Sequence, residues 1–148
     1  MTKITIEMKL ESSIEQVWSR LVDWESHSSW IPATKVRLTN SLTGVGATFT
    51  GTTQIGPFVL EDPMTVTKFS APKDGHAECL VRKDGPVLGG TAGFTLKTID
   101  TNTTKLEWVE DIQLRPKVVF WWTEPFVYLV GRVAFTAALK KFADILKD

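Results

Sequence analysis

The sequence contains little of what marks several protein classes. Its one cysteine, Cys79, cannot form an internal disulfide, and the opening MTKITIEMKL alternates polar with apolar residues where a secretion signal would be apolar. The 17 basic residues balance the 17 acidic ones, so no net charge favours nucleic acid or an anionic membrane surface. We therefore expect a cytoplasmic protein that does not bind nucleic acid.

Metal and cofactor motifs are also scarce. His27, His76 and Cys79 are too few and too scattered for a recognisable zinc or iron site, and Gly89-Gly90 matches neither a phosphate loop nor a dinucleotide fingerprint. Cys79 reads as a small buried hydrophobe, and His27 lies in a serine-rich segment that we expect to be exposed. We expect no metal and no cofactor.

What the chain does have is apolar residues, which make up 43% of its 148 positions. This is enough for one domain, residues 1–148, that buries roughly 70% of the surface of its unfolded form. Residues 118–139 are mostly apolar, but Glu124 and Arg132 would each cost about 2.5 to 3.5 kcal/mol at a bilayer centre, and Pro125 favours the first turn of a helix. A membrane span is therefore disfavoured.

Hydrophobic periodicity predicts one strand, two short helices, further strands and a long helix. Residues 3–10 alternate as a half-buried strand does, and Ser12 with Glu15 forms a capping-box pattern before a helix. A second short helix or turn covers 23–30. The remaining strands are expected at about 35–38, 47–53, 57–69, 75–83, 88–99 and 104–115, with a bulge or an edge position at Pro63.

The last element is expected at 125–147, as a long helix whose inward side includes Val127, Tyr128, Ala134 and Phe135. The whole order predicts an α+β fold. About seven antiparallel strands would curve around the C-terminal helix, with two short helices after the first strand.

The stretch SSIEQVWSRLVDWESHSSWIP after the first strand resembles the start of the START-like (SRPBCC) superfamily, which includes polyketide cyclase/dehydrase and lipid-transfer proteins. The marks are Val17-Trp18, Asp23, Trp30 with Pro32, and Gly44-x-Gly46 before a strand. The resemblance implies a helix-grip fold whose sheet and C-terminal helix enclose an apolar cavity for a lipid, sterol, quinone or polyketide. It does not fix function, because members include carriers, enzymes, receptors and protein-binding modules.

Glu110 is the most informative candidate, because it shares a strand row with Leu106, Trp108 and Ile112. It is either a cavity carboxylate with a raised pKa or a residue that lies near the splayed strand end or pairs with a neighbouring Arg or Lys, and the second interpretation is favoured. The candidate ligand-binding residues, each also explained as core, are Trp30, Phe58, Leu60, Met64, Phe94, Leu96, Trp108, Glu110, Ile112, Tyr128, Gly131 and Phe135. The row of His76, Glu78, Leu80 and Arg82 reads as an exposed polar face more readily than as an acid/base pair.

Three functions follow from these residues. The leading hypothesis is binding or transfer of a hydrophobic small molecule between the sheet and the long helix. The alternative is a cyclase-, dehydratase- or hydrolase-like enzyme that uses Glu110, with or without Tyr128 as a proton donor. The third is an interaction module, in which an apolar patch within 118–133 covers the cavity entrance or contacts a membrane surface, a partner or a second copy. Its residues are Phe120, Trp121, Trp122, Phe126, Leu129 and Val133, and the plain alternative is that Trp121 and Trp122 fold back near Trp24 and Trp30.

Overall fold

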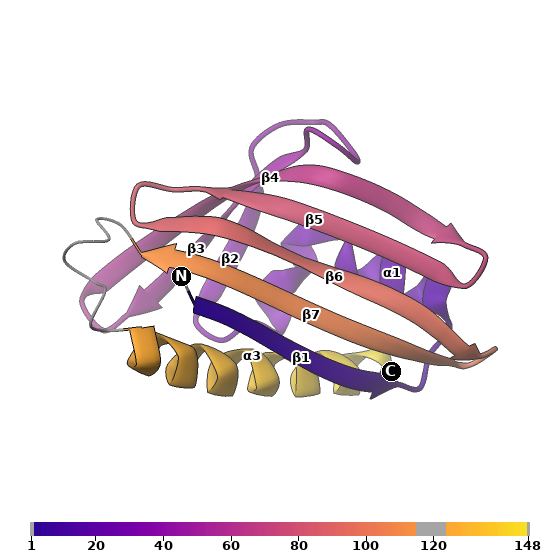
Figure 1. The fold of residues 1–148 in the computed structure, drawn as a ribbon. Coiled ribbons are helices and arrows are strands. Elements are labelled where there is room, and N and C mark those ends of the chain that lie inside the picture. Colours follow the sequence, from indigo (N-terminus) through magenta and orange to yellow (C-terminus); the bar gives the residue numbers. More distant parts are fainter. Residues whose placement is uncertain (1, 115–123, 148) are drawn as a thin grey trace.

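The computed structural model describes residues 2–114 and 124–147 and contains one curved sheet with a long helix beneath it (Figure 1). The strands are β1 Thr2–Leu10, β2 Thr34–Leu38, β3 Thr48–Ile55, β4 Phe58–Lys73, β5 His76–Asp84, β6 Leu88–Asp100 and β7 Thr103–Leu114. The helices are α1 Ile14–Leu21, the 3-10 helix η1 Trp24–Ser29 and α3 Glu124–Leu146. The predicted α+β helix-grip architecture is confirmed.

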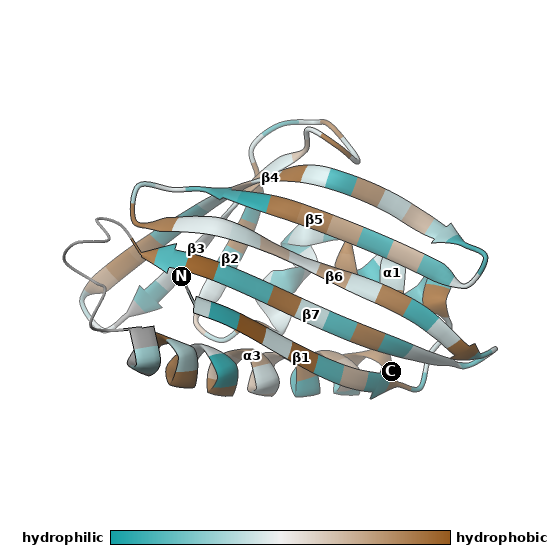
Figure 2. Cartoon of the chain, in the orientation of Figure 1, coloured by the Kyte–Doolittle hydropathy of each residue, from teal (hydrophilic) through white to brown (hydrophobic). Residues whose placement is uncertain are grey.

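The sheet is antiparallel throughout, in the order β1-β7-β6-β5-β4-β3-β2. The first strand therefore pairs with the last, from Thr2 opposite Ile112 to Leu10 opposite Thr104. Figure 2 shows the alternation of polar and apolar residues along these strands, which the sequence predicted for residues 3–10. Each strand consequently turns one row of side chains toward the helices and the other outward.

Helix α1 begins one residue later than the predicted capping pair would place it. The Oγ atom of Ser13 accepts a hydrogen bond from the backbone N–H of Gln16 at 3.3 Å, while Ser12 Oγ donates to Gln16 Oε1 at 2.7 Å. Ser13 is thus the N-cap, because its backbone is extended and its hydroxyl reaches the third residue of the helix. The prediction of Ser12 with Glu15 was wrong by one position.

Pro63 lies where β4 has only one partner. It pairs with Thr50 of β3, and the pairing of β4 with β5 begins only at Met64. Proline donates no backbone hydrogen bond, so this local edge tolerates it. The predicted interruption at Pro63 is therefore an edge position, and the register shifts in β4 come later, between Val66 and Lys68 and between Ser70 and Lys73.

Helix α3 packs mainly through its second half, where Ala138, Leu139 and Phe142 are buried. Its first half lies close to β1, since a Cβ atom on Gly131 would come within 2.6 Å of Ile4 Cδ1. Gly131 thus allows close contact with the sheet and leaves no room there for a guest. Tyr128 and Ala134, which the periodicity placed inward, are exposed, whereas Ala138 and Phe142 of the same predicted side are buried. Within the described ranges, no helix is long and apolar enough to cross a membrane.

Candidate functional site

A cavity of about 120 Å³ lies inside the curve of the sheet, walled by η1, the strands β2 to β7 and α3. Most of its wall is apolar or aromatic. The residues on it are Trp24, His27, Ile31, Thr34, Val36, Phe49, Gly51, Thr53, Asp62, Met64, Cys79, Val81, Lys83, Ala92, Gly93, Phe94, Trp108, Glu110 and Phe135.

Stacked rings support this wall. Trp24 stacks on Phe49 with 4.3 Å between ring centroids, and Phe94 lies nearly parallel to Trp108 at 6.0 Å. Phe135 brings α3 into the same group, with its ring centroid 6.2 Å from that of Trp108. Because these rings come from η1, β3, β6, β7 and α3, their contacts connect the helices to the sheet around the cavity.

Three ionisable side chains meet in the cavity wall. Lys83 Nζ on β5 donates a hydrogen bond to Asp62 Oδ2 on β4 at 2.7 Å, and it lies 3.5 Å from Glu110 Oε2 on β7. The Lys83 side chain is 5% exposed and that of Glu110 is 4% exposed. Burial of charges to this degree requires that they compensate one another.

The electrostatics of this group follow from its composition of two carboxyls and one ammonium. Burial raises the pKa of Glu110, and the charge of Asp62 raises it further, while attraction to Lys83 opposes both. Burial by itself would lower the pKa of Lys83, but the attraction of Glu110 and Asp62 together with the hydrogen bond to Asp62 outweighs it and raises that pKa. Lys83 is therefore held as a cation, and Glu110 takes up a proton more readily than a glutamate in water.

Several polar atoms in the wall lack a hydrogen-bond partner within the described parts of the chain. They are Asp62 Oδ1, Glu110 Oε2 and the indole Nε1 of Trp108. Leaving such an atom buried and unsatisfied costs about 1 to 3 kcal/mol, and native structures contain few of them. Two acceptors and one donor of this kind therefore belong to residues that line one cavity.

His27 also lines the cavity, and the expectation that it is exposed was wrong. Its ring is 4% exposed, between Trp24 and Trp30, and Nε2 lies 2.6 Å from the carbonyl oxygen of Leu21. The 3-10 helix turns this side chain inward although serines surround it in the sequence. Burial lowers the pKa of His27 to about 4, so the ring is neutral near pH 7 and Nε2–H donates to the carbonyl.

The two faces of β5 match the sequence prediction. Cys79 is fully buried in the wall, and burial together with the charge of Glu78 raises its pKa to about 12, so it is an inert thiol. On the other face His76 and Arg82 are exposed and Glu78 forms an ion pair with Lys68. The row that begins at His76 is therefore a solvated face.

The structure brings some of the predicted ligand-binding residues together and separates others. In the cavity wall lie Met64, Phe94, Trp108, Glu110 and Phe135, and away from it lie Trp30, Phe58, Leu60, Leu96, Ile112, Tyr128 and Gly131. Phe58 begins β4 beside a hairpin turn and is 74% exposed. Leu96 is fully buried in the core, and Tyr128 is 42% exposed on α3.

Sequence reasoning missed Lys83 and Asp62, although both left a signal. Lys83 ends the apolar row of Ala77, Cys79 and Val81, and Asp62 stands between Leu60 and Met64 on the inward row of β4. A charged residue on an inward apolar row indicates a buried polar site, as Glu110 does on β7. Glu110 is both a cavity carboxylate and a residue paired with a lysine, because its side chain lines the cavity and lies 3.5 Å from Lys83 Nζ.

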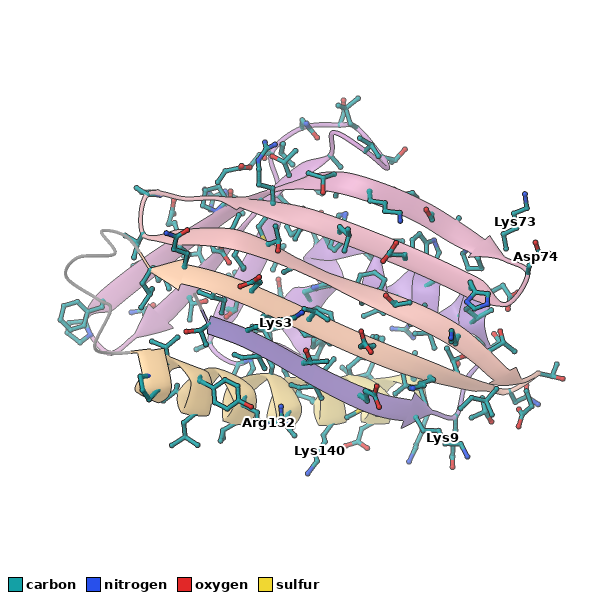
Figure 3. All side chains as sticks on the ribbon, in the orientation of Figure 1. Lys3, Lys9, Lys73, Asp74, Arg132 and Lys140 are labelled. Atoms are coloured by element: carbon teal, nitrogen blue, oxygen red, sulfur yellow. The ribbon has the colours of Figure 1, made fainter. Side chains whose placement is uncertain are left out.

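The predicted apolar patch is only partly described. Phe120, Trp121 and Trp122 lie outside the described residues, as does the side chain of Phe126. Leu129 and Val133 are 60% and 63% exposed on the first half of α3. Figure 3 shows Arg132 and Lys140 on the same helix, with Lys140 pointing away from the sheet. Arg132 also donates a hydrogen bond to the backbone carbonyl of Thr5, at 2.9 Å.

Comparison with known proteins supports the fold. No family model and no curated protein matches the sequence. Among solved structures, the Zhui aromatase/cyclase from Streptomyces sp. R1128 matches with a TM-score of 0.75 and 13% identity, over 98% of this chain and 93% of that one. A STAR-related lipid transfer protein from Xanthomonas axonopodis matches with a TM-score of 0.68 and 13% identity, over 99% and 86%.

A START superfamily protein from Mycobacterium smegmatis matches with a TM-score of 0.68 and 11% identity, over 99% of this chain and 98% of that one. At such identities the likeness shows the fold alone. The START-like resemblance read from the sequence is thus confirmed as a resemblance of fold, across nearly the whole chain.

Proposed function

We propose that this protein binds or transfers a hydrophobic small molecule, lipid-, polyketide- or quinone-like, in the cavity between the sheet, η1 and α3. The observation that carries the proposal is the aromatic wall with unpartnered Asp62, Glu110 and Trp108 atoms in it. Apolar walls with a few converging polar groups are typical of small-molecule sites. Two proteins of the same fold are named an aromatase/cyclase and a lipid transfer protein.

The size of the cavity limits what it encloses. A cavity of about 120 Å³ takes a single ring or the end of a longer molecule. Ile31, Thr34 and Val36 line both this cavity and a surface groove between β2, β3 and Lys141 of α3. A longer ligand would place its polar end at the cluster of Asp62, Lys83 and Glu110 and extend its tail past Ile31, Thr34 and Val36.

Native mass spectrometry of the purified protein and quenching of its Trp fluorescence by a panel of lipids, quinones and aromatic polyketides test the proposal. We expect a bound guest or a saturable response. Ala92→Leu adds bulk to the wall and should abolish the response, whereas Thr91→Leu, on the exposed row of the same strand, should leave it unchanged. No guest and no saturable response across the panel would refute the proposal.

A second candidate function is catalysis, because Glu110 is a buried carboxyl with a raised pKa beside a lysine. Such a group is suited to act as a general acid or base on a ligand in the cavity. Tyr128, the other catalytic candidate, lies away from the cavity wall. If turnover is found with a cavity ligand, Glu110→Gln should lower kcat by about 100-fold or more. Unchanged turnover in that variant would exclude this mechanism.

A further inference from the structure

The cavity wall contains more carboxyl than ammonium groups. Asp62 and Glu110 supply two carboxyls, and Lys83 supplies one ammonium, which already donates to Asp62 Oδ2 at 2.7 Å. The pair of Lys83 with Glu110 is looser, at 3.5 Å, and Glu110 Oε2 accepts no hydrogen bond from any described residue. With both carboxyls ionised, the cluster therefore carries one uncompensated negative charge, which a buried site strongly disfavours.

The atoms without hydrogen-bond partners indicate which group would compensate this negative charge. Asp62 Oδ1 and Glu110 Oε2 are two acceptors of residues that line the cavity, and the indole N–H of Trp108, the unpartnered donor beside them, can satisfy only one, so at least one further donor is missing. A proton on Glu110 restores neutrality but leaves Asp62 Oδ1 unsatisfied. A primary ammonium restores neutrality and has enough N–H groups for both oxygens.

The rest of the wall fits the body of such a cation. Trp24, Phe49, Phe94, Trp108 and Phe135 surround the cavity, and aromatic faces attract a nearby ammonium as well as apolar carbon. We propose that the ligand of this cavity is an amine whose ammonium lies between Asp62 and Glu110 while its apolar or aromatic body packs among these rings. This inference rests on the proposed binding function and names the chemical class of the ligand.

The ammonium would replace the proton of Glu110, so binding should release that proton. The other ionisable groups facing Glu110 do not obscure this. Lys83 on β5 and Asp62 on β4 form the pair described above, while the pKa of Cys79 on β5 is raised to about 12 and that of His27 on η1 is lowered to about 4. From α3 the wall receives Phe135, which does not titrate. Because burial raises the pKa of Glu110, affinity for the amine should consequently rise with pH above the usual range of a glutamate.

Three probes of equal size test the inference: benzylamine, benzyl alcohol and ethylbenzene, which differ in one terminal group. Binding to the whole protein is measured by Trp fluorescence and calorimetry at several pH values. We expect benzylamine to bind at least about 10-fold more tightly than the other two near pH 8, with release of a proton that calorimetry in buffers of different ionisation enthalpy detects. Affinity for ethylbenzene should be independent of pH.

Glu110→Gln keeps the shape of the side chain and removes its charge. It should abolish the preference for benzylamine and its pH dependence while ethylbenzene still binds, and Glu107→Gln, on the other row of β7, should change neither. If benzyl alcohol or ethylbenzene binds wild-type protein as tightly as benzylamine at every pH, or if the preference survives in Glu110→Gln, the inference is wrong and the binding function stands. If none of the three binds and the lipid panel also fails, both are wrong.

Discussion

The interior of this protein has two ends that are built differently. At the packed end, apolar side chains from β1, α1, β6, β7 and α3 are almost completely buried: Leu10, Leu21, Leu96, Leu106, Leu139 and Phe142. At the polar end, Asp62, Lys83 and Glu110 share the wall of a cavity with unpartnered oxygens. The comparison shows that one part of a sheet can stabilise the fold while another part of the same sheet holds the polar groups suited to bind a ligand. The packed end stabilises the fold, so the polar end tolerates groups that cost free energy.

The largest effect should come from the packed end. Phe142 is 1% exposed and its ring centroid lies 5.0 Å from that of Trp30, so Phe142→Ala leaves a cavity that its neighbours fill poorly. We expect a loss of about 4 kcal/mol in the free energy of unfolding, measured with urea. Phe58→Ala at the exposed start of β4 is the matched control and should cost less than about 0.5 kcal/mol. Equal losses would show that the packed end is not the main source of stability.

His27 lies between the two ends, with its ring 4.7 Å from that of Trp30 and its edge on the cavity. Because its pKa is lowered from 6.5 to about 4, the unfolded chain binds a proton that the folded protein rejects. The free energy of unfolding should therefore fall by about 3 kcal/mol as the pH drops from about 6.5 to about 4.

His27→Gln should remove this part of the pH dependence, since a glutamine amide can donate to the Leu21 carbonyl but does not titrate. His76→Gln replaces the other histidine, which is exposed, and should retain the full slope. Urea unfolding at a series of pH values measures both. Identical slopes in wild-type protein and His27→Gln would contradict a buried neutral ring.

At the polar end, removing one partner should cost less than at the packed end. Lys83→Met leaves Asp62 and Glu110 without their cation, which usually costs about 3 to 5 kcal/mol for a buried pair. Here we expect about 2 kcal/mol, because Glu110 takes up a proton and the Asp62 side chain is 16% exposed. Lys105→Met breaks the exposed pair with Glu7 and should cost less than about 0.5 kcal/mol.

Replacing the whole cluster sharpens the comparison further. The triple variant Asp62→Leu, Lys83→Met, Glu110→Leu should regain most of the stability lost in Lys83→Met, because buried ion clusters are often no more stable than apolar side chains of similar volume. It should also lose any ligand that needs the polar groups. A triple variant less stable than Lys83→Met would show that the cluster stabilises the fold itself.

The packed end and the sheet could be predicted from the sequence, because alternation within each strand reports which row is buried. The same alternation placed Glu110 on the inward row of β7. Alternation within a strand could not show which charged side chains contact one another. Lys83, Asp62 and Glu110 come from three strands, and the distances between them depend on the register across the sheet. The available signal for the buried cluster was a charged residue at the end of an inward apolar row. Lys83 shows that this signal is informative in every strand.

The errors have physical causes too. His27 was expected at the surface because of its serine neighbours, but the orientation of a short 3-10 helix depends on the rings it meets, and Trp24 and Trp30 draw it inward. Tyr128 was placed inward by helical periodicity. The first half of α3 is apolar nearly all round, so the sequence alone does not show which side contacts β1.

That first half of α3 belongs to the polar end and yields the smallest expected change in stability. Leu129 and Val133 are exposed, so replacing both with Ser should alter the free energy of unfolding by no more than about 0.5 kcal/mol. Self-association, one of the contacts that the sequence left open for this patch, is tested by sedimentation. If the patch joins two copies, the wild-type molecular mass rises with concentration and the double variant remains monomeric, while Ala137→Ser on the same helix behaves as wild type. A wild-type monomer at every concentration would remove self-association and leave the exposed residues to a membrane surface or another protein, which flotation with lipid vesicles then distinguishes.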